Sequence, residues 1–192
     1  MGSCQLEESG SLKVRAFFGL PVPDPQREEL RRYITACTAL APEFRWTPAA
    51  NLHLTVRFVG GVERSLVEGI ANRLVETPSQ RFQVELGEAG TFRRGRLVRV
   101  VWIGLRAGAD EARALAAAVE AECVRTGLVP EARPFQPHLT LARARGRDGS
   151  PLPPLPDPPR LEAWLADELV LYSSHLGRSG AVYESLRRLR LS

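Results

Sequence analysis

The chain has 192 residues, of which 44% are hydrophobic and 25% are charged, a composition typical of a soluble globular protein. Its length suits one large domain or two intimate lobes, and a chain of this size folds without a disulfide or metal. The composition excludes disordered, collagen-like and coiled-coil chains, and no apolar stretch is long enough for a transmembrane helix.

The formal net charge of +4 comes almost entirely from arginine, because Lys13 is the only lysine. Arginine binds phosphate in a bidentate manner, so the charge permits a nucleic-acid or phosphate partner, although charge alone favours a solvated basic surface. Cys4, Cys37 and Cys123 form no Cys-x-x-Cys spacing. They indicate a reducing, cytoplasmic protein without a zinc site.

The N-terminal half of the chain begins with residues 1–12, which lack periodicity and are predicted to be an appendage. The apolar run Lys13–Leu20 predicts a strand. Asp24 is predicted to cap a helix that has Pro25 at its first position. Residues 51–61 (NLHLTVRFVGG) predict a second strand, closed by two glycines.

In the middle of the chain, segments with the apolar spacing of a helix alternate with segments that have the spacing of a strand. Apolar residues around Ile70 predict a helix, and two strands follow over Arg81–Phe92 and Leu97–Leu105. A third helix is predicted from Asp110 to Thr126, where a glycine and a proline end it. Residues 136–145 (QPHLTLARAR) then predict another strand.

The C-terminal part contains a stiff loop over Ser150–Pro159, which holds 6 of the 15 prolines and is expected to join elements rather than domains. Trp164 and Leu165 are expected on a short helical turn. Glu168–Ser174 and Ala181–Leu191 predict a closing strand pair. This order of elements is not a regular series of βαβ units, so we predict an α+β fold with antiparallel pairing.

A repeated histidine motif is the most informative feature of the sequence. His53-Leu-Thr-Val and His138-Leu-Thr-Leu lie 85 residues apart and indicate an internal duplication. Because side chains alternate along a strand, His53 and Thr55 share one face, and so do His138 and Thr140. If the two halves pack about a pseudo-twofold axis, all four side chains face one cleft.

These four side chains suit acid–base catalysis at phosphorus. Histidine titrates at about pH 6.5, so a neutral imidazole can take a proton from water while a charged one protonates the leaving alkoxide. The threonine hydroxyls can donate hydrogen bonds to the non-bridging phosphate oxygens. The scheme needs no metal, and it predicts a bell-shaped pH dependence with an optimum near neutrality.

Other interpretations apply to the same residues. A single His-x-Thr on a strand is usually a structural edge pair, but two matched copies favour a site. A zinc site is weaker, because no third ligand accompanies the histidines. His175, in a glycine-bearing turn, is expected to be a solvated bystander. Arg57 shares its strand parity with His53, so it either adds charge to the cleft or is a solvated edge arginine.

The sequence resembles the two-histidine (2H) phosphoesterase superfamily, and within it the RNA 2′,3′-cyclic phosphodiesterases, also called 2′-5′ RNA ligase-like proteins. The segments that carry the resemblance are Arg15-Ala-Phe-Phe with Pro21, residues 46–60 (WTPAANLHLTVRFVG), residues 92–105, Pro134–Arg145 (PFQPHLTLARAR) and residues 171–186 (LYSSHLGRSGAVYESL).

The resemblance implies a bilobal fold, in which residues 13–192 form one domain of two pseudo-symmetric lobes of antiparallel sheet plus helices around a central cleft. It implies metal-independent hydrolysis of an RNA 2′,3′-cyclic phosphate end to a 2′-phosphate, without a cofactor, and reversible 2′-5′ ligation. RNA, such as tRNA halves, is the expected partner of a cytoplasmic monomer.

The resemblance also assigns roles to site residues. His53 corresponds to the proton donor, His138 to the proton acceptor, and Thr55 and Thr140 to phosphate-contacting residues. Arg143 corresponds to a phosphate-binding arginine, although its odd offset from His138 requires a bulge or strand end to reach the cleft. Two alternatives remain: a non-catalytic RNA- or nucleotide-binding module, and an enzyme for a small cyclic phosphate such as ADP-ribose cyclic phosphate.

Overall fold

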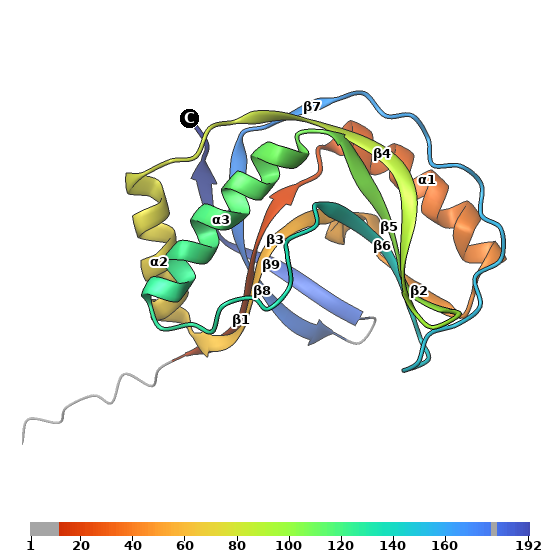
Figure 1. The fold of residues 1–192 in the computed structure, drawn as a ribbon, viewed down its shortest axis with the longest axis horizontal. Helices are drawn as coiled ribbons and strands as arrows, with labels where there is room; N and C mark the ends of the chain where they lie inside the picture. Colours follow the sequence, from red (N-terminus) through yellow and green to blue (C-terminus); the bar gives the residue numbers. More distant parts are fainter. Residues whose placement is uncertain (1–11, 178–179) are drawn as a thin grey trace, which may run out of the picture.

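The computed structural model describes residues 12–177 and 180–192, which form two lobes of antiparallel sheet with helices packed on them (Figure 1). In chain order the elements are β1 (Lys13–Pro21), α1 (Asp24–Leu40), β2 (Phe44–Trp46), the 3-10 helix η1 (Ala49–Asn51), β3 (His53–Glu63), α2 (Arg64–Glu76), β4 (Phe82–Arg94), β5 (Leu97–Ala107), α3 (Ala109–Arg125), β6 (His138–Ala144), β7 (Trp164–Ala166), β8 (Glu168–Gly177) and β9 (Gly180–Arg190).

The strands form a nine-stranded sheet in the order β7-β4-β5-β6-β3-β1-β8-β9, with β2 added to β6. This order is symmetric about the β6/β3 junction, which leaves four strands of the path on each side. At that junction Leu54 pairs with Leu139, its own counterpart in the histidine repeat. Because equivalent residues meet in an antiparallel pair, a local twofold axis relates the two motifs. The predicted α+β bilobal fold is confirmed.

The helices cover the sheet lobe by lobe. Helices α2 and α3 pack together on the lobe that contains β3, whereas α1 contacts β2 and η1 beside the other lobe (Figure 1). Helix α1 follows β1 but lies by the opposite lobe, and α3 follows β5 but packs on β3. The chain therefore crosses between the lobes, and neither lobe is a continuous segment.

The proline-rich loop lies along α1. Tyr33 Oη donates a hydrogen bond of 2.9 Å to the carbonyl of Pro156, and Gln26 Nε2 donates one of 3.1 Å to the carbonyl of Glu162. Ser150, at the start of the loop, forms an isolated bridge with Val98 of β5. The loop thus connects elements within the fold, as the sequence predicted.

Two local predictions were wrong. Trp164 and Leu165 belong to strand β7, which pairs with β4, because Trp164 and Ala166 are both buried while Leu165 between them is exposed. That alternation has the period of a strand. Asp24 does not cap α1, because Pro23 occupies the capping position and no side chain bonds the free amides. Asp24 is the first helical residue, where its negative charge suits the helix dipole.

Residues 1–11, most of the predicted appendage, lie outside the described residues. Leu12 is described, and its carbonyl accepts a hydrogen bond of 2.9 Å from the backbone amide of Arg64. Within the described part of the chain, no helix has both the length and the apolar character needed to cross a membrane.

Candidate active site

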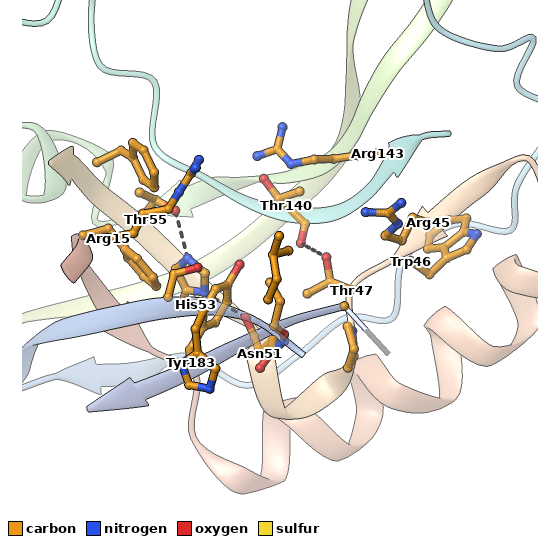
Figure 2. Close-up of a pocket in the computed structure, with 18 of the residues that line it drawn as sticks. Arg15, Arg45, Trp46, Thr47, Asn51, His53, Thr55, Thr140, Arg143 and Tyr183 are labelled. Carbon is orange, nitrogen blue, oxygen red and sulfur yellow. Dashed lines mark hydrogen bonds between the residues drawn. The ribbon is translucent and has the colours of Figure 1, made fainter. Parts of the chain in front are cut away.

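A cleft of about 920 Å³ lies where strands of the two lobes meet (Figure 2). Strands β3 and β6, the segment from β2 to η1, and the β8–β9 hairpin all contribute side chains to it. Among the described residues that line the cleft, four are arginines, namely Arg15, Arg45, Arg143 and Arg145, and none is an aspartate or glutamate. The cleft therefore attracts anions.

His53 is the first residue of β3, and both of its ring nitrogens have partners. Nδ1 lies 2.8 Å from the carbonyl oxygen of Asn51, and Nε2 lies 3.0 Å from Oγ1 of Thr55 (Figure 2). A carbonyl can only accept, so Nδ1 carries the proton and Nε2 of the neutral ring is free to accept from the threonine hydroxyl. Nε2 is thus the nitrogen that carries no proton in the neutral ring.

Aromatic rings surround His53. Its ring centroid lies 4.6 Å from that of Phe17, 5.2 Å from that of Tyr183 and 6.0 Å from that of Tyr172. A Cβ atom on Gly19 would lie only 3.2 Å from Cδ2 of His53, so the glycine gives the imidazole its room against β1.

Burial among these rings lowers the pKa of His53 to about 4, since a buried imidazole loses the hydration of its charged form. The hydrogen bond to Asn51 opposes this shift, and the positive charges of Arg143 and His138 add to it. In the free protein His53 is therefore neutral at pH 7.

His138 begins β6 in the same way that His53 begins β3. Its Nδ1 lies 2.7 Å from the carbonyl of Gln136, two residues earlier, so Nδ1 again carries the proton and Nε2 of the neutral ring is unprotonated. Its ring packs on Phe92 and Trp102, at centroid distances of 5.1 and 6.0 Å. Burial, followed by the charge of Arg143, lowers the pKa of His138 as well.

The structure places four of the five predicted site residues in the cleft and one at its margin. His53, Thr55, Thr140 and Arg143 all line the cleft. His138 is not among the residues that line it and lies at its margin, beside Phe92 and Trp102, yet close enough for its charge to lower the pKa of His53.

A bulge in β6 turns Arg143 toward the cleft. Val101 of β5 pairs with Ala142, and the next residue, Trp102, pairs with Thr140, so Leu141 is the extra residue. Leu141 and Ala142 are both buried, which breaks the alternation of faces. Arg143 then shares a face with Thr140, which is the bulge that its offset from His138 required.

The matching bulge in β3 has the opposite effect on Arg57. Phe18 pairs with Arg57 and Gly19 with Thr55, so Val56 is the extra residue, and Phe58 faces the cleft instead of Arg57. The prediction that strand parity could direct Arg57 into the cleft was therefore wrong. The alternative of a solvated arginine was wrong too, because the side chain is only 8% exposed.

Arg57 is held by partners on the helical side of the sheet. Its guanidinium forms ion pairs with Glu120 of α3 and with Glu131, and it donates a hydrogen bond of 2.8 Å to the carbonyl of Val129. Glu131 and Val129 lie in the segment that leads to His138. Arg57 thus connects the strand of one histidine motif to the segment that precedes the other motif.

Several cleft residues escaped the sequence analysis. Asn51 orients His53 through its carbonyl, and its side-chain amide donates a hydrogen bond of 2.7 Å to the carbonyl of Ala181 in β9. Thr47 Oγ1 donates one of 3.2 Å to the carbonyl of Thr140. Arg45 and Tyr183 line the cleft as well. Asn51, Thr47 and Tyr183 belong to segments that carry the family resemblance, and Arg45 immediately precedes one of them, but their spacing alone did not indicate a role.

His175 lies on strand β8 opposite Val182, and not in a turn as the sequence suggested. Its side chain is exposed, as predicted, and it lines the cleft at the rim that the β8–β9 hairpin forms.

Comparison with known proteins agrees with this arrangement. Residues 22–178 match the family described as the 2′-5′ RNA ligase superfamily. The Escherichia coli K12 protein named RNA 2′,3′-cyclic phosphodiesterase is 31% identical over 179 residues, which is 93% of this chain and 97% of that protein. The Aeropyrum pernix protein of the same name is 40% identical over 101 residues, or 53% of this chain and 57% of the relative.

Among solved structures, E. coli LigT complexed with 3′-AMP superposes with a TM-score of 0.82 at 28% identity, covering 94% of this chain and 99% of that one. The crystal structure of LigT complexed with phosphate gives a TM-score of 0.77 at the same identity, covering 94% of this chain and 98% of that one. The likeness thus extends over both lobes.

Proposed function

Because the chain belongs to the 2′-5′ RNA ligase superfamily of two-histidine phosphoesterases, we propose that it hydrolyses the 2′,3′-cyclic phosphate end of RNA to a 2′-phosphate. The observation that carries the proposal is the pair of His-x-Thr motifs, related by a local twofold axis at a cleft lined by arginines. The activity named for the E. coli and A. pernix relatives supports the same class of reaction.

In the proposed mechanism the two histidines act on opposite sides of phosphorus. Nε2 of His138 takes a proton from a water molecule as the water oxygen bonds to phosphorus. The bond from phosphorus to the ribose 3′ oxygen breaks, and protonated Nε2 of His53 gives its proton to that oxygen. The 2′ ester remains, so the product is a 2′-phosphate. The scheme uses no metal.

Charge on the non-bridging phosphate oxygens increases in the transition state. The hydroxyls of Thr55 and Thr140 and the guanidinium of Arg143 lie in the cleft and are the proposed donors to these oxygens. A bound phosphate anion also raises the pKa of His53, because an opposite charge favours the imidazolium. The substrate thereby helps to form the acid that its own cleavage needs.

The same arrangement supports 2′-5′ ligation. If the 5′-hydroxyl of a second RNA replaces water, His138 takes the hydroxyl proton and the oxygen bonds to phosphorus, while the 3′ oxygen leaves as before. We propose RNA ends as the substrate in both directions, with one chain sufficient for the cleft.

The test is incubation with RNA that ends in a 2′,3′-cyclic phosphate, after exhaustive EDTA treatment and with or without added divalent ions. We expect a 2′-phosphate, identified by chromatography against 2′- and 3′-phosphate standards, at the same rate in all samples. A 3′-phosphate would reverse the roles of the histidines. Loss of activity in EDTA that one metal restores would make them ligands, and binding without turnover would indicate a binding module.

A further inference from the structure

Two arginines oppose each other directly at one end of the cleft. Arg45 of β2 pairs with Arg143 of β6, so their side chains share a face, with about 5 Å between the Cβ atoms of such a pair. Both are exposed and line the cleft, and Figure 2 shows both guanidinium groups there. Like charges in this arrangement destabilise a sheet. Anions that bind to the two groups offset this repulsion.

Carboxylates do not compensate these charges. Exposed arginines on the helices are paired with acidic neighbours, for example Arg31 with Glu28, Arg32 with Glu29 and Arg113 with Asp110. In the described part of the chain, neither Arg45 nor Arg143 has an ion-pair partner.

Arg145, two residues beyond Arg143, also lines the cleft at this end. Its Nε donates a hydrogen bond of 3.2 Å to the carbonyl of Pro42, which leaves its two terminal nitrogens free to bind an anion. Three uncompensated guanidinium groups therefore gather at the β2 end of the cleft, which is more positive charge than one phosphate needs.

The opposite end of the cleft is different. There Phe58 occupies the position equivalent to Arg143, and the guanidinium of Arg15 lies over its ring, 5.0 Å from the centroid. That arginine is already engaged in a cation–π contact. Of the cleft-lining residues that the structure describes, the arginines free to meet a nucleic-acid strand extending from the reacting phosphate therefore lie toward β2.

The positive surface continues beyond the β2 end. Strand β5 pairs with β6 as far as Val100 and Arg143, so the β4–β5 turn lies next to the end of β6. The exposed arginines of this region are Arg93, Arg96, Arg99 and Arg147, while Arg94 is paired with Asp148.

On the basis of the proposed function, we propose that Arg45 and Arg145 form a subsite for a second phosphate, the one on the 5′ side of the terminal nucleotide. Arg143 then contacts the reacting phosphate, and the RNA chain leaves the cleft over β2. Arginine suits this role because its planar group binds phosphate in a bidentate manner. The enzyme is therefore specific for an end that carries a 5′ phosphate or phosphodiester.

Three substrates distinguish contacts to the reacting phosphate from contacts to the 5′ phosphate. They are adenosine 2′,3′-cyclic phosphate, the same nucleotide with a 5′-phosphate, and an oligoadenylate that ends in the cyclic phosphate. In Arg45→Ala we expect KM to rise about tenfold for the second and third, and to stay within about twofold for the first. Arg45→Lys should give a smaller rise. Arg81→Ala is the matched control, because Arg81 is exposed and does not line the cleft.

Salt dependence and stability provide readouts that a structural role would not produce. For the oligoadenylate, the slope of log KM against log salt should fall by about 0.7 in Arg45→Ala and not in Arg81→Ala, because one phosphate contact is lost. The midpoint of thermal unfolding of Arg45→Ala should equal or exceed that of the wild type, since the variant relieves the repulsion with Arg143.

Equal rises of KM for all three substrates would overturn the subsite, because Arg45 would then act on the reacting phosphate. An unchanged KM for all three, or a rise confined to the oligoadenylate, would overturn it too. Binding of the corresponding 2′-phosphate products needs no turnover, and the dissociation constants should change in the same pattern. If the dissociation constants of Arg45→Ala and the wild type differ in this pattern but the wild type cleaves none of the substrates, the proposed function fails while the subsite stands.

Discussion

His53 lies among three aromatic side chains, and this burial determines how the site responds to pH. The proposed scheme needs His53 protonated and His138 neutral, yet the pKa values of both are lowered, that of His53 to about 4. The fraction of free enzyme in the active form therefore increases as pH falls below 6.5, because His53 gains its proton. It decreases again at lower pH, once His138 is protonated as well.

We accordingly predict that kcat/KM has a bell-shaped pH profile whose maximum lies on the acid side of pH 6.5, rather than near neutrality as the unperturbed pKa suggests. The profile of kcat should be displaced to higher pH, because bound phosphate raises the pKa of His53. Initial rates from about pH 4 to pH 8 measure both. A kcat/KM maximum above pH 7 would contradict the assignment of His53 as the acid.

We predict that His53→Ala and His138→Ala each lower kcat about 10²–10⁴-fold, because each removes a proton-transfer group. His53→Asn is a second variant that keeps a polar side chain in the aromatic pocket. His175→Ala should stay within about twofold of the wild type, since the scheme gives this exposed rim histidine no role. Circular dichroism verifies folding, and near-normal activity in either catalytic variant would exclude that histidine.

At the scale of the elements, one extra residue in each of β3 and β6 decides which side chains reach the cleft. Val56 and Leu141 occupy equivalent positions after the His-x-Thr motifs, and each reverses the faces of the residues that follow. Arg143 is thereby brought into the cleft, and Arg57 is turned toward α3. Neither bulge is visible in the sequence, because a bulge is defined by the pairing with the neighbouring strand.

We predict that Arg57→Leu lowers the free energy of unfolding by about 1–3 kcal/mol, because Glu120 and the segment at Val129 lose a buried partner. The matched control is Arg113→Ala, whose exposed pair with Asp110 should contribute less than about 0.5 kcal/mol. Urea denaturation measures both. Equal effects of the two variants would show that the Arg57 cluster does not join the two motifs.

At the scale of the whole molecule, the chain crosses between the lobes through α1 and α3, and the strands of both lobes share the β3–β6 junction. We therefore predict that residues 13–192 unfold as one unit. Circular dichroism and tryptophan fluorescence should give coincident urea transitions, because all three tryptophans, Trp46, Trp102 and Trp164, belong to one lobe while helicity reports on both. Two separate transitions would indicate two independent domains.

Several properties of this protein follow from its sequence alone. The strand and helix periods, the proline-rich loop and the matched His53 and His138 motifs depend on residues close together in the chain. The α+β class was predicted from the order of elements, and the bilobal fold and membership of the two-histidine phosphoesterases from the family resemblance; all three are confirmed. Alternation within a strand is a local property, so the shared face of each histidine and its threonine was predictable too.

The tertiary structure decided what depends on pairing between distant segments. Register placed Arg45 opposite Arg143 across 98 residues of sequence and moved His175 from an expected turn onto β8. Packing from three separate strands buried His53 and lowered its pKa. A one-residue change of register reverses the face of every side chain that follows, and no local pattern encodes it. The proposed catalytic groups could therefore be named from the sequence, whereas their charge state and the arginines beside them required the fold.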